Sequence, residues 1–219
     1  MIHKKLLGAG GSGGYKFPNS TILNSFSSPS TYPYGLAFDG TNLISCDVGG
    51  LIYIHSGVTS TVSSSFSATQ PSGLTFDGTN LISCLTDDTI RVHSGVTSTI
   101  SSSFRAPAFA PTGLAFDGTN LISCNSSTDR IYVHSGISST ISSNFESQSI
   151  QPTGLAFDGT NLISCDSITD TIYVHDGVSS TILTSFSAPS SSPGGLTFNG
   201  TNLISCDNDS DTIYVHGRG

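Results

Sequence analysis

Cysteine and histidine recur at regular intervals in this sequence, and both residue types can bind metals or provide nucleophiles and bases. The chain contains five cysteines and six histidines. Every cysteine is followed by a histidine nine or ten residues later. These residues are Cys46, His55, Cys84, His93, Cys124, His134, Cys165, His175, Cys206 and His216. Such a series could provide a zinc site, disulfides or a cysteine nucleophile.

The expected strands argue against zinc and disulfides, and the equivalence of all five copies argues against a cysteine nucleophile. Each cysteine ends a segment Asn-Leu-Ile-Ser-Cys, and each histidine ends a segment such as Thr-Ile-Tyr-Val-His. If these two segments form an antiparallel hairpin, Cys165 and His175 are offset by about three residues, roughly 10 Å. Zinc ligands must lie within about 2.3 Å of one ion, and disulfides need Cα atoms within about 7 Å. We therefore predict buried free thiols, with no metal and no cofactor.

The cysteine belongs to an internal repeat, Gly-Leu-Ala/Thr-Phe-Asp/Asn-Gly-Thr-Asn-Leu-Ile-Ser-Cys. Copies begin at intervals of 38 to 41 residues, at Gly35, Gly73, Gly113, Gly154 and Gly195. A period near 40 residues is typical of propeller blades. One copy contains four strand-like segments, called A (154–157), B (161–165), C (171–175) and D (180–186), with tight turns between A and B and between C and D. The sequence thus predicts an all-β fold, a five-bladed β-propeller with four antiparallel strands per blade.

The order of the segments predicts how the ring closes. Segments A, B and C occur five times, but D follows only the first four copies. A D-like segment, 20–26, stands alone before the first copy. We predict that it pairs with 212–216 as the outer strand of the last blade, since an open solenoid would expose apolar residues at both ends. The expected domains are a Gly-rich arm (1–19), the propeller (20–216) and a tail (217–219).

The repeats differ mainly in their B–C and D–A connections, which emerge on the same face of a blade. Binding residues commonly lie on variable loops of a rigid scaffold, although neutral drift in loops that need only be soluble is the alternative. Exposed aromatic residues suit interfaces and sugar faces. The predicted partner-binding or ligand-binding residues are Tyr32, Tyr34, Asp87, Asp88, Arg105, Phe109 and Ile150.

Other motifs are weak. The run 207–211 resembles the first half of a calcium loop, but the positions for glycine and glutamate hold Thr212 and Arg218, which favours a solvated loop. We recognise no catalytic triad, phosphate loop or dinucleotide fingerprint.

The charge distribution limits the class of partner. The net charge is −8, and all fifteen acidic residues follow residue 38. An acidic body argues against nucleic acid or an anionic membrane as the main partner. No segment approaches the roughly 20 apolar residues of a membrane helix, and the apolar run at the start is shorter than a signal peptide needs. We expect folding in the cytoplasm.

Two resemblances extend these predictions. The repeat resembles NHL-type and streptogramin-lyase-like propeller repeats over residues 20–216, which implies the fold; the catalytic residues of such lyases cannot be placed here. The arm resembles the Gly-rich starts of some bacteriophage structural proteins, and four of its residues are the expected anchor to protein partners in an assembly such as a virion: Lys4, Lys5, Leu6 and Leu7.

These observations give three hypotheses. The first is a non-enzymatic interaction module, a structural or adhesion component of a virion or phage tail that is anchored by its arm. The second is a lectin-like propeller that binds glycans on the variable face, at shallow sites between blades. The third is a lyase or hydrolase that uses the central channel.

Overall fold

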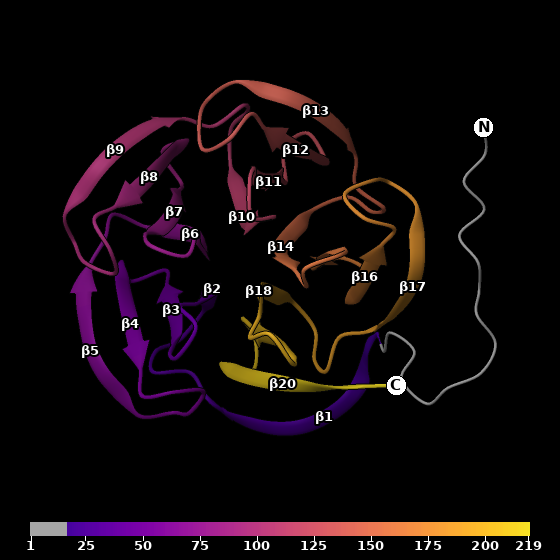
Figure 1. The fold of residues 1–219 in the computed structure, drawn as a ribbon. Helices are drawn as coiled ribbons and strands as arrows, with labels where there is room; N and C mark the ends of the chain where they lie inside the picture. The colour runs from indigo at the N-terminus through magenta and orange to yellow at the C-terminus, as the bar shows by residue number, and fades with distance from the viewer. Residues whose placement is uncertain (1–16) are drawn as a thin grey trace.

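A computed structural model describes residues 17–219, so the predicted anchor residues Lys4, Lys5, Leu6 and Leu7 lie outside the described residues. Twenty strands in the described part form five four-stranded antiparallel sheets around a central axis (Figure 1). The predicted all-β, five-bladed propeller is confirmed. No helix in residues 17–219 is long and apolar enough to cross a membrane.

Each blade presents one strand to the axis and one to the rim. The strands nearest the axis, strand A of each repeat, are β2 (Pro33–Phe38), β6 (Pro71–Phe76), β10 (Pro111–Phe116), β14 (Pro152–Phe157) and β18 (Pro193–Phe198). The B strands are β3 (Leu43–Asp47), β7 (Leu81–Leu85), β11 (Leu121–Asn125), β15 (Leu162–Asp166) and β19 (Leu203–Asp207). The C strands are β4 (Leu51–His55), β8 (Thr89–His93), β12 (Arg130–His134), β16 (Thr171–His175) and β20 (Thr212–Arg218). The outer D strands are β5 (Val62–Ser67), β9 (Ile100–Arg105), β13 (Ile141–Glu146), β17 (Ile182–Ser187) and β1 (Pro18–Ser27).

The ring closes through the first strand, as predicted. β1 pairs antiparallel with β20, so blade 5 consists of β18, β19, β20 and β1 (Figure 1). Both strands are longer than expected, because Pro18 pairs with Arg218 and the N–H of Gly219 donates to the carbonyl of Phe17 at 3.0 Å. Residues 217 and 218, predicted as a tail, therefore belong to the sheet. Proline suits this position because the first residue of an edge strand need not donate to the ladder.

The repeated glycine of strand A brings the inner strands into backbone contact. A Cβ atom at Gly113 would lie 2.9 Å from the Cα of Gly154 and 2.9 Å from the carbonyl oxygen of Thr153. The corresponding glycines Gly35, Gly73 and Gly195 are equally crowded by the next blade. The space left among the strands at this level is too narrow for a water molecule, so backbone closes the axis. Only glycine allows this approach, which explains its presence in every copy.

The core lies between neighbouring blades and is built from the A, B and C strands. In blade 3 (β10–β13), Leu121, Ile122, Cys124 and Ile131 are fully buried. The phenylalanine of each outer strand covers this layer, as Phe145 does beside the Ile131 cluster. Five such clusters follow one another around the ring, which gives the rigid scaffold on which the loops stand.

Candidate functional site

The cysteines are structural in this fold. All five are free and buried, as predicted. Burial raises the pKa of the Cys84, Cys124 and Cys165 thiols to about 12 and that of Cys46 and Cys206 in the same direction. A thiol is a nucleophile only as the thiolate, so these side chains behave as small apolar groups at neutral pH. Among residues 17–219, no three Cys, His, Asp or Glu side chains are grouped so as to hold a metal ion.

The histidines that end the C strands are also built into the sheets. In blade 3, His134 Nε2 lies 2.9 Å from Ser123 Oγ, and His134 Nδ1 lies 2.6 Å from the carbonyl oxygen of Ser138. A carbonyl can only accept, so Nδ1 carries the proton and the neutral ring accepts from the serine hydroxyl at Nε2. Burial lowers the pKa of His134. The edge of Phe104 from the preceding blade packs on the ring, with centroids 5.9 Å apart.

All five blades repeat this arrangement. The serine–histidine pairs of the other four blades are Ser45–His55, Ser83–His93, Ser164–His175 and Ser205–His216. Blade 5 has no C–D turn, and there the carbonyl of Asn19 in β1 takes the place of the turn carbonyl, 3.1 Å from His216 Nδ1. β1 thus provides the same histidine–carbonyl contact that the C–D turn provides in the other blades. In each blade the histidine has a structural role.

The A–B and C–D turns form a uniform face because each turn supports the other. Asp39 Oδ1 accepts from the backbone N–H groups of Thr41 and Asn42 at 2.8 and 2.6 Å, which closes the A–B turn. Asn42 Oδ1 then accepts from the N–H of Gly57 in the C–D turn at 3.0 Å. Asn80, Asn120 and Asn161 bind the next three C–D turns in the same way. The constancy of this face therefore follows from internal bonding.

The opposite face, where the B–C and D–A connections emerge, has a constant frame and variable side chains. An aspartate with positive φ ends the B–C turn of blades 2 to 5, at Asp88, Asp129, Asp170 and Asp211. Its carboxylate accepts from a backbone N–H in the following D–A connection, that of Ala110, Gln151, Ser192 or Tyr32 respectively, at 2.7 to 3.0 Å. These four residues also have positive φ, so the bond fixes a left-handed turn in each connection.

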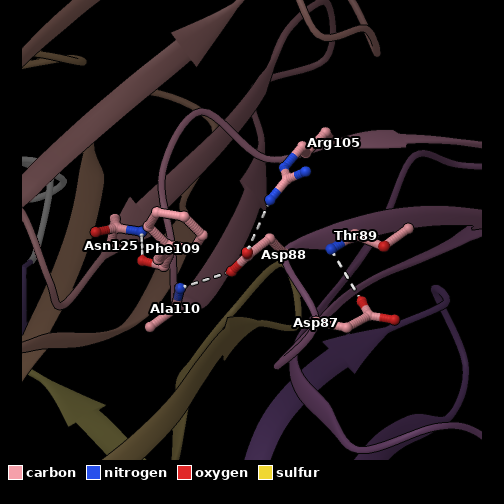
Figure 2. A network of polar contacts seen from close by, with 7 residues as sticks. All are labelled: Asp87, Asp88, Thr89, Arg105, Phe109, Ala110 and Asn125. Carbon is pink, nitrogen blue, oxygen red and sulfur yellow. Dashed lines mark hydrogen bonds and ion pairs between the residues drawn. The ribbon is translucent and has the colours of Figure 1, made fainter.

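The structure changes the role of one predicted site residue. Asp88 is buried, 8% exposed, and its carboxylate accepts from the N–H of Ala110 at 3.0 Å and lies 3.4 Å from Arg105 Nη2 (Figure 2). It supports the loop and is not presented to a partner. The reason is the bond just described, which needs a carboxylate at this position. Asp87, by contrast, has an exposed side chain that accepts from the N–H of Thr89 at 3.0 Å (Figure 2).

Three predicted residues are strongly exposed on this face. Tyr32, Phe109 and Ile150 are 52%, 68% and 61% exposed. The side chain of Arg105 is also exposed and lies over the ring of Phe109, 5.8 Å from its centroid. Two more apolar residues on B–C turns, Val48 and Ile168, are similarly exposed, and the sequence analysis missed them. We call these five apolar residues the crown: Tyr32, Val48, Phe109, Ile150 and Ile168.

Tyr34 occupies a different place. It is half-buried and lines a basin of about 370 Å³ at the axial end of the inner strands, on the same face as the crown. The wall of this basin comes from blades 1 to 4 and includes Tyr34, Val48, Gln70, Thr86, Ser126 and Gln151. The structure thus places Tyr32, Phe109 and Ile150 in the crown, Tyr34 in the basin wall and Asp88 in a supporting contact. The side chains of Asp87 and Arg105 are exposed on the same face.

The chain is a five-bladed β-propeller. It is similar to the glutaminyl cyclase of Myxococcus xanthus, with a TM-score of 0.79 and 11% identity, over 92% of this chain and 97% of that chain. It is also similar to a chain of the mitotic checkpoint complex, with a TM-score of 0.55 and 16% identity, over 82% of this chain and 62% of that chain. No protein-family profile and no curated protein matches the sequence. At these identities the likenesses show the fold alone.

Proposed function

We propose that this chain is a non-enzymatic binding module that docks a protein partner on its B–C/D–A face. The distribution of exposed apolar residues carries the proposal. Of the nine large hydrophobic residues exposed in the described part, five form the crown and four lie on outer strands; the A–B and C–D turns have none. Aromatic and aliphatic side chains gathered on one face suit a protein interface.

The chemistry of the face favours binding over catalysis. A lyase, hydrolase or cyclase needs an acid–base group or a nucleophile beside its substrate. No Asp, Glu, Cys, His, Lys or Arg lines the basin within residues 17–219, so its serine, threonine and tyrosine hydroxyls have no such base among the lining residues to activate them. The buried serine–histidine pairs lie within the sheets and are identical in every blade.

A photo-crosslinking experiment tests the docking face. We would place a benzophenone amino acid at Phe109 in one variant and at Thr160, on an A–B turn of the opposite face, in another. In lysate of the source cells we expect one discrete adduct from position 109, lost when Tyr32→Ser and Ile150→Ser are added. Equal crosslinking from position 160, or an adduct that survives the two substitutions, would overturn the proposal.

The sequence of the arm extends the proposal to a larger assembly. We propose that the arm anchors the propeller to protein partners, with a bacteriophage virion or tail as the setting; its resemblance to phage structural proteins is the support. The test is light scattering of the full-length protein during size-exclusion chromatography. Charge and polarity changes at Lys4, Lys5, Leu6 and Leu7 (K4E, K5E, L6S, L7S) should abolish assembly, and unchanged assembly would contradict this role.

The alternative function is a carbohydrate-binding propeller. The observation in its favour is the basin, whose polar side chains are all neutral. In this alternative, the sugar would bind at one site near the axis and not at the shallow sites between blades that were predicted from the sequence.

A further inference from the structure

The basin has the size and position of a small-molecule site. Its volume of about 370 Å³ falls within the range of small-ligand pockets, roughly 300–1,000 Å³. Below the basin, the glycines of the inner strands close the axis, so the basin is a pocket closed at its base and not the mouth of a channel. Its wall differs from blade to blade: the positive-φ position of the D–A connection holds Gln70 before blade 2, Ala110 before blade 3 and Gln151 before blade 4.

The polar groups of the wall have unused hydrogen-bonding capacity. Gln70 Oε1 accepts from Thr86 Oγ1 at 2.9 Å, which orients the amide and leaves its Nε2 group available to donate. Within the described part of the chain, the Tyr34 hydroxyl, the Ser126 hydroxyl and the Gln151 side-chain amide make no hydrogen bond with protein. Hydroxyl and amide groups both donate and accept.

Two aspartate side chains hold wall segments of the basin in place. Asp129 Oδ1 accepts from the N–H of Gln151 at 3.0 Å, and Asp88 Oδ1 accepts from that of Ala110 at the same distance. Both donor residues adopt positive φ, with values of 78° for Gln151 and 57° for Ala110. A wall held by the frame needs little reorganisation when a ligand enters, which favours binding.

The chemistry of the wall selects the class of ligand. A phosphate, carboxylate or ammonium group would enter without an opposite charge, because no charged side chain lines the basin within residues 17–219. Groups that both donate and accept match hydroxyl groups, which do the same. The tyrosine ring and the aliphatic surfaces of Val48, Pro71 and Pro111 suit a C–H face.

We propose that the basin binds one neutral pyranose residue, such as a terminal hexose or N-acetylhexosamine of a glycan. Gln70 and Gln151 hold its hydroxyl groups, and Tyr34 contacts its C–H face. This inference rests on the proposed function because it places the sugar on the same face of the propeller. The residues that bind the sugar are those of the basin, which the crown surrounds. The crown docks protein and the basin selects sugar, and the two share only Val48, so variants at the other residues test the two roles separately.

The experiment is a glycan array with the full-length protein, followed by calorimetry with the methyl glycoside of the best terminal sugar. We expect neutral terminal sugars to bind and sialylated or sulfated ones not to. Gln70→Ala and Gln151→Ala should each weaken binding about tenfold, since each removes hydrogen bonds to the sugar. Ser126→Trp should block the basin by bulk. The matched control, Thr79→Ala on an A–B turn, should leave affinity unchanged.

Three outcomes would overturn the inference: no neutral glycan binds, only charged glycans bind, or Gln70→Ala and Gln151→Ala bind as the parent protein does. Circular dichroism and thermal unfolding of each variant show whether it is folded. The crown variant Tyr32→Ser/Ile150→Ser separates the two proposals. It should retain sugar binding while it loses the crosslinked adduct; a crosslinked adduct without any glycan binding would leave the docking role standing and this inference refuted.

Discussion

The carboxylate of Asp211 accepts a hydrogen bond of 2.7 Å from the backbone N–H of Tyr32, 179 residues earlier in the chain. Asp211 ends the last B–C turn, and Tyr32 lies in the first D–A connection, so this bond crosses the closure of the ring. Between consecutive repeats, the N–H of Ser192 donates to Asp170 in the same way, at 2.9 Å and over 22 residues. Closure therefore extends from the β1–β20 sheet to the loops that carry the crown.

We expect Asp211→Gly to lower the free energy of unfolding by about 1–3 kcal/mol, because it leaves the N–H of Tyr32 without its acceptor. Glycine is the suitable replacement since it tolerates positive φ, and Gly50 already occupies this position in blade 1. Urea unfolding measures the change. Asp176→Ala, in an exposed C–D turn, is the control, and an equal loss in that variant would contradict the prediction.

A second prediction comes from comparing blades at the end of strand B. Asn125 donates its side-chain amide to the carbonyl of Phe109. Asp166 and Asp207 stand at the same position in blades 4 and 5, and the Oδ2 atom of each is buried with no hydrogen-bond partner within the described residues. Asp166→Asn or Asp207→Asn should therefore raise the free energy of unfolding by about 1 kcal/mol. Thermal unfolding checks this, and the reverse change Asn125→Asp should destabilise.

The buried histidines predict sensitivity to acid. Burial lowers the pKa of His55, His93, His134, His175 and His216 in the folded protein. The unfolded chain then binds more protons than the folded one, so stability is full above the unfolded pKa near 6.5 and falls as the pH drops through it. Each histidine contributes a slope of up to about 1.4 kcal/mol per pH unit.

Urea unfolding between pH 8 and pH 5 measures this slope. His134→Gln should be less stable than the parent at pH 8. The slope of its unfolding free energy against pH should be smaller by the contribution of one histidine. An unchanged slope in that variant would show that His134 does not contribute to the acid sensitivity.

The contact between inner strands gives a fourth prediction. Gly113→Ala should destabilise the protein by about 3 kcal/mol, since its Cβ would lie 2.9 Å from backbone atoms of the next blade that cannot move aside. Gly118→Ala, at a positive φ but with nothing within 4 Å of its Cβ, should cost about 1 kcal/mol from backbone strain alone. Denaturant unfolding of both variants separates crowding from strain, and equal losses would contradict the crowding.

The fold could be predicted because its signals repeat. Five copies of one segment gave the blade, and the solitary segment at 20–26 gave the closure. The role of Asp88 could have been found in the same way, since Asp129, Asp170 and Asp211 occupy its position in later copies. The B–C and D–A connections combine a turn position that recurs in blades 2 to 5 with lengths and side chains that vary.

The basin could not be predicted from the sequence. Gln70 and Gln151 belong to different repeats, and neither neighbours the other in the chain. Their positions around the basin depend on how closely the inner strands of neighbouring blades approach one another and on the positive-φ turns of the D–A connections. These are properties of the closed ring, which local sequence patterns do not contain.

The pairing of Pro18 with Arg218 also has a mechanical consequence. Because β1 and β20 run antiparallel, both ends of the described chain leave the propeller at the same corner of one sheet (Figure 1). A force that pulls these ends apart would peel the two strands from that corner and break the ladder one hydrogen bond after another. The β1–β20 pairing should thus separate under a small force. A force directed along a pair of strands elsewhere in the ring must break many hydrogen bonds at once.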